Sequence, residues 1–299
     1  MNKKLIFIVA ILISGTSLFA QDAQLQDTVW RINGDFALNL NQVTLTNWAA
    51  GGQNSFAWNA TAGLDANYAK DKWKWDNAIR LGYGLLRQGE DPINKTDDQI
   101  LINTNLGYQM KGAWYATLNA NFRTQFTNGY DLPGDSVIST FMAPAYLVSG
   151  LGFEYKPNDN FRASLSPTTN KTTFVMDDAL SALGAYGVDA GSNVRAEFGA
   201  FLTLAYKKEI LKNVNFETLY TMFGNYQDLA AWDINWDMIF DFKINNFLSA
   251  NLTTNLIYDQ DIDIPVDSTG DGVNDTSGPR VQFRESFGIG LKANFSGVK

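Results

Sequence analysis

The stretch QFRESFGIGLKANF, at residues 282–295, decides the fold of this chain. Apolar side chains occupy one parity of the stretch: Phe283, Phe287, Ile289, Leu291, Ala293 and Phe295. Polar or small residues occupy the other: Gln282, Arg284, Ser286, Gly288, Gly290, Lys292 and Asn294. Successive side chains of a strand point to opposite faces, so the stretch predicts a strand with one apolar and one polar face.

The same alternation recurs along the chain and predicts twelve strands. They are expected at 30–44, 56–68, 73–86, 100–110, 114–126, 145–156, 161–175, 194–206, 214–223, 232–244, 247–259 and 282–295. The pattern is weakest at 161–175, because Pro167 has no N–H to donate to a neighbouring strand.

Three features favour a membrane barrel over a soluble sandwich. Most segments span 11 to 15 residues, whereas soluble strands usually have about 5–6. Aromatic residues gather at the ends of the apolar faces, as in the interfacial girdles of membrane barrels. The polar faces carry charged residues and glycine, which would make a poor soluble core. Since lipid cannot satisfy an open sheet edge, the sheet must close. The prediction is an all-β, transmembrane, antiparallel up-and-down β-barrel of about 12 strands.

Connections alternate between short and long, as in barrels with short periplasmic turns and longer outer loops. With an even strand count, this places both termini in the periplasm. The short turns hold lysines, and the six long loops (45–54, 88–98, 127–143, 176–193, 225–231 and 260–280) hold most of the loop carboxylates. The outer mouth is therefore expected to be acidic. The net charge of −8 and the lack of a basic stripe argue against nucleic acid as a partner.

The first twenty residues resemble a cleaved signal peptide. Lys3 and Lys4 precede an apolar run, Leu5 to Ile13, that is too short to cross a bilayer; a membrane-anchor helix is the alternative. The expected organisation is a signal peptide at 1–20, a short periplasmic segment at 21–29 and the barrel at 30–299. The predicted location is the outer membrane of a Gram-negative bacterium. An exported chain with no cysteine cannot rely on disulfides.

Two motifs resemble an uncharacterised family of Gram-negative outer-membrane barrels, a domain of unknown function. The first, LTNWAAGGQNS at 45–55, contains Asn47, Trp48, Ala49, Ala50, Gly51, Gly52 and Asn54. The second, GPRVQFRESFGIGLKANF at 278–295, resembles the family's final strand. Its closing aromatic, Phe295, is similar to the signal that the barrel-insertion machinery reads, although Ser-Gly-Val-Lys follows it here. The resemblance implies a location and a fold but no activity.

The glycines of the first motif permit positive φ and close backbone approach. One hypothesis is a loop that folds inward and narrows the pore. The other is a compact turn that places Trp48 in the outer aromatic girdle.

No typical catalytic apparatus is present. The chain has no histidine and no cysteine, and outer-membrane barrel enzymes generally need a histidine as base or water activator. We therefore predict that the protein is not an enzyme.

Charged residues on the polar strand faces are candidates to line the barrel interior. They are Asp65, Asp76, Arg80, Arg123, Arg162, Arg195, Glu197, Glu217, Asp237, Asp241 and Arg284. They either form a charged constriction that selects solutes or a network of paired charges that fills and stiffens the barrel. A barrel of twelve strands is intermediate in size between barrels of about 8 strands, whose interior is filled, and open porins of 16–18 strands. Both hypotheses therefore stand.

The loop DSTGDGVND, residues 267–275, resembles the start of a calcium-binding loop, with Asp267, Thr269, Asp271 and Asp275 as ligands. Gly278 stands where the bidentate glutamate would be. The alternatives are a solvated acidic loop, or a divalent ion that bridges the loop to lipopolysaccharide phosphates. No other cofactor is expected.

Two functions remain open at this point. The first is a narrow passive channel for small hydrophilic solutes, with cations enriched at the acidic mouth. The second is a non-conducting barrel that serves as an adhesin or as a scaffold for an outer-membrane partner. Both predict contact with outer-membrane lipid and lipopolysaccharide.

Overall fold

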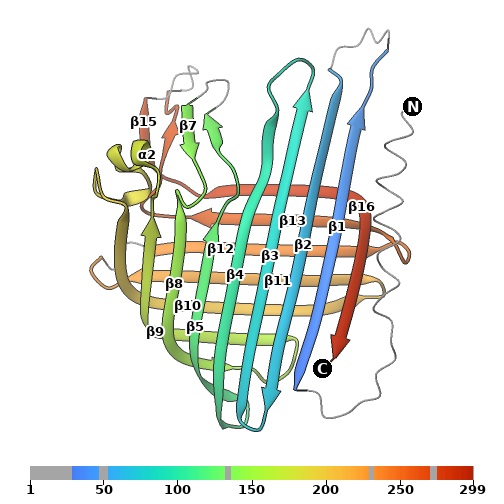
Figure 1. Cartoon of the computed structure of the whole chain (residues 1–299), viewed down its shortest axis with the longest axis vertical. Helices are drawn as coiled ribbons and strands as arrows, with labels where there is room; N and C mark the ends of the chain where they lie inside the picture. The colour runs from blue at the N-terminus through green and yellow to red at the C-terminus, as the bar shows by residue number, and fades with distance from the viewer. Residues whose placement is uncertain (1–28, 47–52, 132–135, 229–231, 270–274, 299) are drawn as a thin grey trace.

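The computed structural model describes residues 29–46, 53–131, 136–228, 232–269 and 275–298. Twelve antiparallel strands close into a barrel in the order β1-β16-β13-β12-β11-β10-β9-β8-β5-β4-β3-β2 (Figure 1). They are β1 (Trp30–Val43), β2 (Ser55–Lys70), β3 (Trp73–Gln88), β4 (Asn94–Lys111), β5 (Trp114–Thr124), β8 (Ala145–Tyr155), β9 (Phe161–Phe174), β10 (Val194–Leu211), β11 (Val214–Asn225), β12 (Trp232–Lys243), β13 (Leu248–Tyr258) and β16 (Gln282–Val298). Each predicted strand is present, so the predicted fold class is confirmed.

The first and last barrel strands close the sheet. Arg31 of β1 pairs with Val298 of β16, and Leu38 pairs with Leu291. The beginning of β1 and the end of β16 therefore lie at the same end of the barrel, which is also the end where the short turns lie. We call it the short-turn end. Its assignment to the periplasm remains a prediction.

The two largest differences from the predicted boundaries are in β10 and β4. The segment 207–211, expected in a turn, extends β10 to Leu211, because residues from Lys207 onward continue the ladder with β11. Similarly, β4 begins at Asn94, so Asp97 and Asp98 belong to a strand and not to the preceding loop. Both errors arise because lysine and aspartate are typical of turns, although a long strand that faces water on one side also accepts them.

Pro167 is accommodated inside a continuous strand. The register of β9 shifts near this residue against both neighbours: Leu151 pairs with Thr168 but Phe153 pairs with Leu165, and Gly199 pairs with Thr169 but Phe201 pairs with Ser166. Such a bulge removes the need for a ladder donor at the proline.

The outward face of the barrel is apolar. Phe283, Phe287 and Leu151 are 63%, 64% and 59% exposed. Aromatic rings gather near the short-turn end, where the centroids of Trp73 and Tyr108 lie 4.9 Å apart and those of Trp114 and Tyr155 lie 5.0 Å apart. This inverted arrangement, with apolar side chains outside, is that of a barrel in lipid. Among the described residues, no helix is long and apolar enough to cross a membrane.

Several small elements lie in the long connections and gather at the upper left of Figure 1. They are β6 (Gly129–Asp131), β7 (Ser136–Ser139), α2 (Asp178–Ala182), the 3-10 helix η2 (Ala185–Gly187), β14 (Asp263–Val266) and β15 (Thr276–Pro279). A small apolar cluster of Ala143, Val175, Leu180 and Val188 holds part of this region together. The Tyr186 hydroxyl also donates a hydrogen bond to the Ile138 carbonyl at 2.5 Å. The connections at 127–143 and 176–193 therefore dock on each other, which the sequence pattern did not predict.

Candidate functional site: the interior of the barrel

Ion pairs between strands that are not neighbours identify the inner face. Arg284 of β16 lies 3.2 Å from Asp97 of β4, although β1, β2 and β3 separate these strands. Lys74 of β3 pairs with Glu154 of β8 across β4 and β5. Side chains can meet in this way only across the interior, so the polar parity of the strands faces inward.

One wall of the interior is densely packed with polar groups. Glu154 is fully buried, and its carboxylate accepts hydrogen bonds from Lys74 and, at 2.6 Å, from the amide of Asn105. Lys74 is also held by Asp76 at 3.2 Å. On the same wall, the Asn119 amide donates to the Ser166 hydroxyl at 2.6 Å, and both side chains are buried. The interior is therefore filled on the side formed by β5, β8 and β9.

A second group of charges lies near the long-loop end, and we call it the outer cluster. Its members are Lys171, Arg195, Glu197, Asp233, Asp259 and Asp261. Lys171 pairs with Asp233 and lies 3.5 Å from Glu197 and 3.9 Å from Asp261. Arg195 lies 3.1 Å from Glu197 and 2.7 Å from Asp261. Two cations thus face four carboxylates.

The excess of carboxylates affects Asp259, which follows the last residue of β13. Burial and the nearby Asp233 raise the pKa of Asp259 to about 6, and Lys171 offsets part of this rise. Asp233, Asp259 and Asp261 each bring an oxygen within 4.8 Å of the others. Carboxylates at this spacing could hold a metal ion, but here Lys171 and Arg195 already supply the compensating positive charge.

The connection at 176–193 lies directly against the outer cluster. A Cβ added at Gly187 would be 3.2 Å from the Cβ of Asp261. Gly187 has a φ of +76°, which favours glycine, so the backbone there can approach the charged side chains closely.

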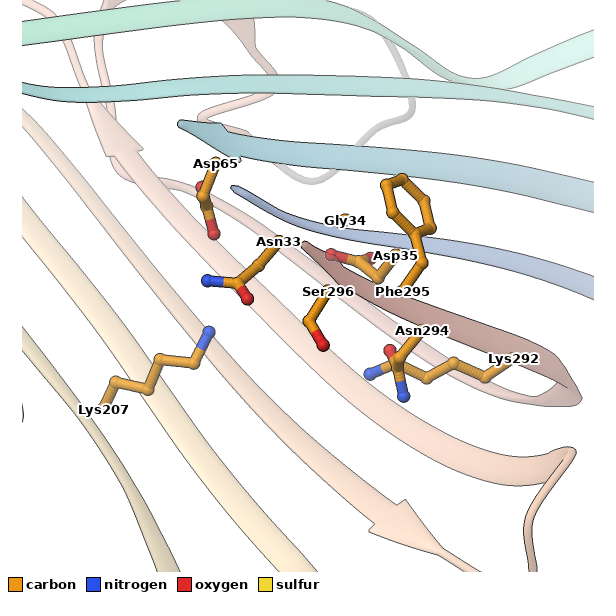
Figure 2. Close-up of a pocket in the computed structure, with 9 residues that line it drawn as sticks. All are labelled: Asn33, Gly34, Asp35, Asp65, Lys207, Lys292, Asn294, Phe295 and Ser296. Atoms are coloured by element: carbon orange, nitrogen blue, oxygen red, sulfur yellow. The ribbon is translucent and has the colours of Figure 1, made fainter. Parts of the chain in front are cut away.

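A cavity inside the barrel, which we call the inner cavity, lies towards the short-turn end, because Asn33 is near the start of β1 and Ser296 is near the end of β16. Figure 2 shows its lining residues. The cavity has a volume of ≈ 300 Å³ and is lined by Asn33, Gly34, Asp35, Asp65, Lys207, Lys292, Asn294, Phe295 and Ser296. Most of these residues come from β1, β2 and β16, which are adjacent, whereas Lys207 comes from β10, five places from β1 in the closed order. Because residues from nearly opposite walls line the same cavity, it spans the interior.

Charges of both signs surround the inner cavity. Asp65 pairs with Arg80 at 2.6 Å, and Lys207 pairs with Glu217 at 2.8 Å. Lys292 pairs with Asp241. Within the described part of the chain, Asp35 has no hydrogen-bonding or ion-pair partner for its carboxylate.

Glycines on the inner face provide space for long polar side chains. Gly63 pairs in register with Asp35, and a Cβ at Gly63 would lie 2.5 Å from the Asp35 carboxylate. Gly107 pairs in register with Lys74, and a Cβ there would lie 2.7 Å from Cε of Lys74. The Asp35 carboxylate thus lies over the neighbouring strand β2, and the Lys74 side chain passes over Gly107 of β4 towards Glu154.

The eleven residues predicted to line the interior fall into three groups. Eight form ion pairs: Asp65, Asp76, Arg80, Arg195, Glu197, Glu217, Asp241 and Arg284. Asp237 accepts hydrogen bonds from the amides of Asn235 at 2.8 Å and Asn255 at 2.6 Å. Arg123 and Arg162 form no ion pair with any described residue.

Sequence reasoning did not single out several residues that hold these clusters together: Asp35, Lys74, Glu154, Lys171, Asp233 and Lys292. Lys74, Asp233 and Lys292 lie on the same parity as the predicted residues of their strands, so the alternation could have found them. Lys171 has the opposite parity to Arg162, because the bulge at Pro167 shifts the register between them, and no interior residue was predicted on β1 or β8, which carry Asp35 and Glu154. The pairing of these residues across the interior could not be read from the alternation.

The first family motif is only partly within the described residues, since 47–52 lie outside them. Asn54 joins three segments: its side chain accepts a hydrogen bond from the Leu45 N–H at 2.6 Å, and its carbonyl accepts one from the Gly89 N–H at 2.7 Å. Asn54 therefore links the two ends of the connection between β1 and β2 to the connection between β3 and β4. The inward-folding and compact-turn hypotheses both stay predictions.

The loop predicted to bind calcium is partly described, and Asp271 lies outside that part. Asp275 accepts hydrogen bonds from the N–H and the hydroxyl of Ser268, both at 2.8 Å. These bonds hold the pKa of the Asp275 carboxyl below its ordinary value. Thr269 donates its N–H to Asp267 at 3.1 Å. Asp267 and Asp275 therefore both accept hydrogen bonds from residues near the start of the loop, Ser268 and Thr269.

A closed antiparallel barrel, an apolar outer belt and a charged interior together define an outer-membrane β-barrel of the Gram-negative type. The profile of a family described as "Protein of unknown function (DUF3078)" matches residues 40–130. That range includes the first motif but not the final strand. No curated protein matches the sequence.

Solved structures with similar folds are outer-membrane proteins. An outer-membrane channel from Pseudomonas putida F1 shares 11% identity over 92% of this chain and 98% of its own, with a TM-score of 0.38. The NanC porin shares 7% over 89% and 99%, with a TM-score of 0.36. The translocator domain of the autotransporter NalP from Neisseria meningitidis shares 8% over 98% and 96%, with a TM-score of 0.32.

Proposed function

We propose that this barrel is a narrow passive channel for small hydrophilic solutes. The inner cavity supports the proposal, because it is polar, reaches from one wall to the other and lies inside a closed barrel. A volume of ≈ 300 Å³ corresponds to about ten water molecules. That space suits a small solute with part of its hydration shell and is too small for a large one.

The arrangement of charge supports a modest preference for cations. Most charges that face the interior are paired, so selectivity has to come mainly from the long loops. Those loops carry exposed carboxylates such as Glu90, Asp91, Asp178 and Asp189. A channel mouth that carries charges of a single sign raises the local concentration of ions of the opposite sign.

Single-channel recording in a planar bilayer tests this proposal. We expect discrete conductance steps and, under a salt gradient, a reversal potential that indicates cation preference. Replacing the four loop carboxylates by amides should shift that potential towards zero without closing the channel. A folded barrel without conductance would refute the proposal.

The second candidate is a non-conducting scaffold or adhesin, and the packed interior favours it. Glu154 is fully buried and Lys171 is 6% exposed, and the connection at 176–193 covers the outer cluster. Such a network would stiffen a platform for the long loops. Absence of conductance from folded protein is the result expected for this candidate.

We also propose a role for the final strand in insertion and infer that the barrel carries no enzymatic activity. Phe295 lies on the outer face, 54% exposed, where the insertion machinery could read it. The lack of histidine and cysteine supports the second inference. Hydrolysis of lipid or peptide substrates by folded protein would contradict it.

A further inference from the structure

We propose that the inner cavity binds small zwitterions, which carry an ammonium and a carboxylate on one molecule, as free amino acids do. The inference rests on the proposed channel function and names the class of solute that the channel favours. Figure 2 shows the arrangement: Asp35 and Asp65 lie on the side of the cavity formed by β1 and β2, and the ammonium of Lys207 faces them from across the interior.

Asp35 is the group that can bind an ammonium. Its carboxylate lies over Gly63, borders the cavity and lacks a partner among the described residues. The neighbouring Asp65 is already paired with Arg80 at 2.6 Å. A cationic group that enters the cavity would therefore pair with Asp35 without breaking an existing ion pair.

Lys207 is the group that can bind a carboxylate. Its partner is Glu217, and the two side chains are 63% and 42% exposed. Exposed ion pairs contribute little to stability, so the ammonium can exchange partners or accept a second one at small cost. Lys292, which also lines the cavity, adds a second positive group.

Three of the remaining lining residues are neutral and polar: Asn33, Asn294 and Ser296. The other two, Gly34 and Phe295, lie on the outward parity of β1 and β16. Amides and hydroxyls both donate and accept hydrogen bonds, so they can replace water around the rest of the solute. A solute with one charge is attracted by one side of this cavity and repelled by the other. A zwitterion can pair with both sides at once.

Liposome swelling with purified, folded barrel tests the inference. The two solutes are glutamine, a zwitterion, and xylitol, an uncharged molecule of similar size. At low solute concentration we expect glutamine to enter faster by up to about fivefold, the upper end of the range that one exposed charge pair supplies. The glutamine rate should also saturate as its concentration rises, which simple diffusion would not show.

Asp35→Asn is the decisive variant. It should remove the advantage of glutamine and leave the xylitol rate close to that of the unaltered protein. The matched control is Glu285→Gln, which makes the same change of charge on the outward parity of β16, away from the cavity.

The outcomes separate this inference from the proposed function. If glutamine and xylitol enter equally fast, or if Asp35→Asn slows both equally, the zwitterion site is refuted while the channel stands. If neither solute enters through folded barrel, the channel itself is refuted.

Discussion

Removing either member of the buried pair Lys74–Glu154 should destabilise the barrel strongly and unequally. Lys74→Met leaves Glu154, which is 0% exposed, with the Asn105 amide at 2.6 Å as a donor and no cation. Breaking a buried ion pair from one side costs about 3–5 kcal/mol, so we expect a loss at the upper end of that range.

Glu154→Gln should cost less, about 3 kcal/mol, because the Lys74 ammonium that remains keeps a carboxylate partner. That partner is Asp76, at 3.2 Å, and the Tyr115 ring lies 4.7 Å from the same ammonium. The double variant should cost less than the sum of the two single variants, because it leaves no unpaired buried charge.

Urea unfolding of the barrel in lipid vesicles measures these free energies by linear extrapolation. The matched control is Glu217→Gln, whose partner Lys207 is exposed and whose loss should cost less than about 1 kcal/mol. The reasoning is refuted if Lys74→Met costs no more than Glu154→Gln, or if both fall within the range of the control.

Three further predictions concern the interior, the outer cluster and the last long loop. Gly63→Leu should lower single-channel conductance, because its side chain would displace the Asp35 carboxylate into the cavity; Gly297→Ala, where a Cβ would meet nothing within 4 Å, is the control. An unchanged conductance would contradict the idea that glycines keep the interior open. The pKa of Asp259 is raised from 3.8 to about 6, so its contribution to stability is largest at acid pH and is lost as pH rises through this window. Asp259→Asn should therefore gain in unfolding free energy relative to the unaltered protein between pH 4 and pH 7; equal pH profiles would count against the raised pKa. Calcium binding to the loop at 267–275, measured by titration calorimetry, should weaken on Asp267→Asn, and no heat with the unaltered protein would remove the calcium prediction.

The strands were predictable because lipid imposes a strict rule on every residue of a membrane strand. Positions that face lipid are mostly apolar, so alternation over more than ten residues, as at 282–295, marks a strand with little ambiguity. Ends of strands were less predictable, since Lys207 and Asp97 are polar residues in positions where a strand continues beyond lipid or faces water. The docked connections at 127–143 and 176–193 follow no repeating pattern and gave no signal.

The sequence predicted which side chains face the interior but not which of them contact each other. The alternation placed Arg284 inside, yet its partner Asp97 is 187 positions away in sequence, and three strands lie between the two in the barrel. Which charges meet depends on register and on the tilt of the strands, and these are properties of the closed sheet. For the same reason, the sequence could not show that Asp35 lacks a partner among the described residues.

The two functional hypotheses differ in where the interior side chains lie, and the pairing of glycine with long polar residues bears on this. A barrel that only needed stiffness would gain from filling every inner position, because side chains that cross the interior tie the walls together. In this barrel, Asp35 stands in register with Gly63 and lies along the wall, whereas Lys74 passes over Gly107 to reach Glu154 on the filled side. Dense packing on the side of β5, β8 and β9 therefore coexists with a polar cavity beside β1, β2 and β16. A stiff wall on one side and open polar space on the other is what a narrow channel requires, because the fixed wall keeps the charges of the opening at constant spacing.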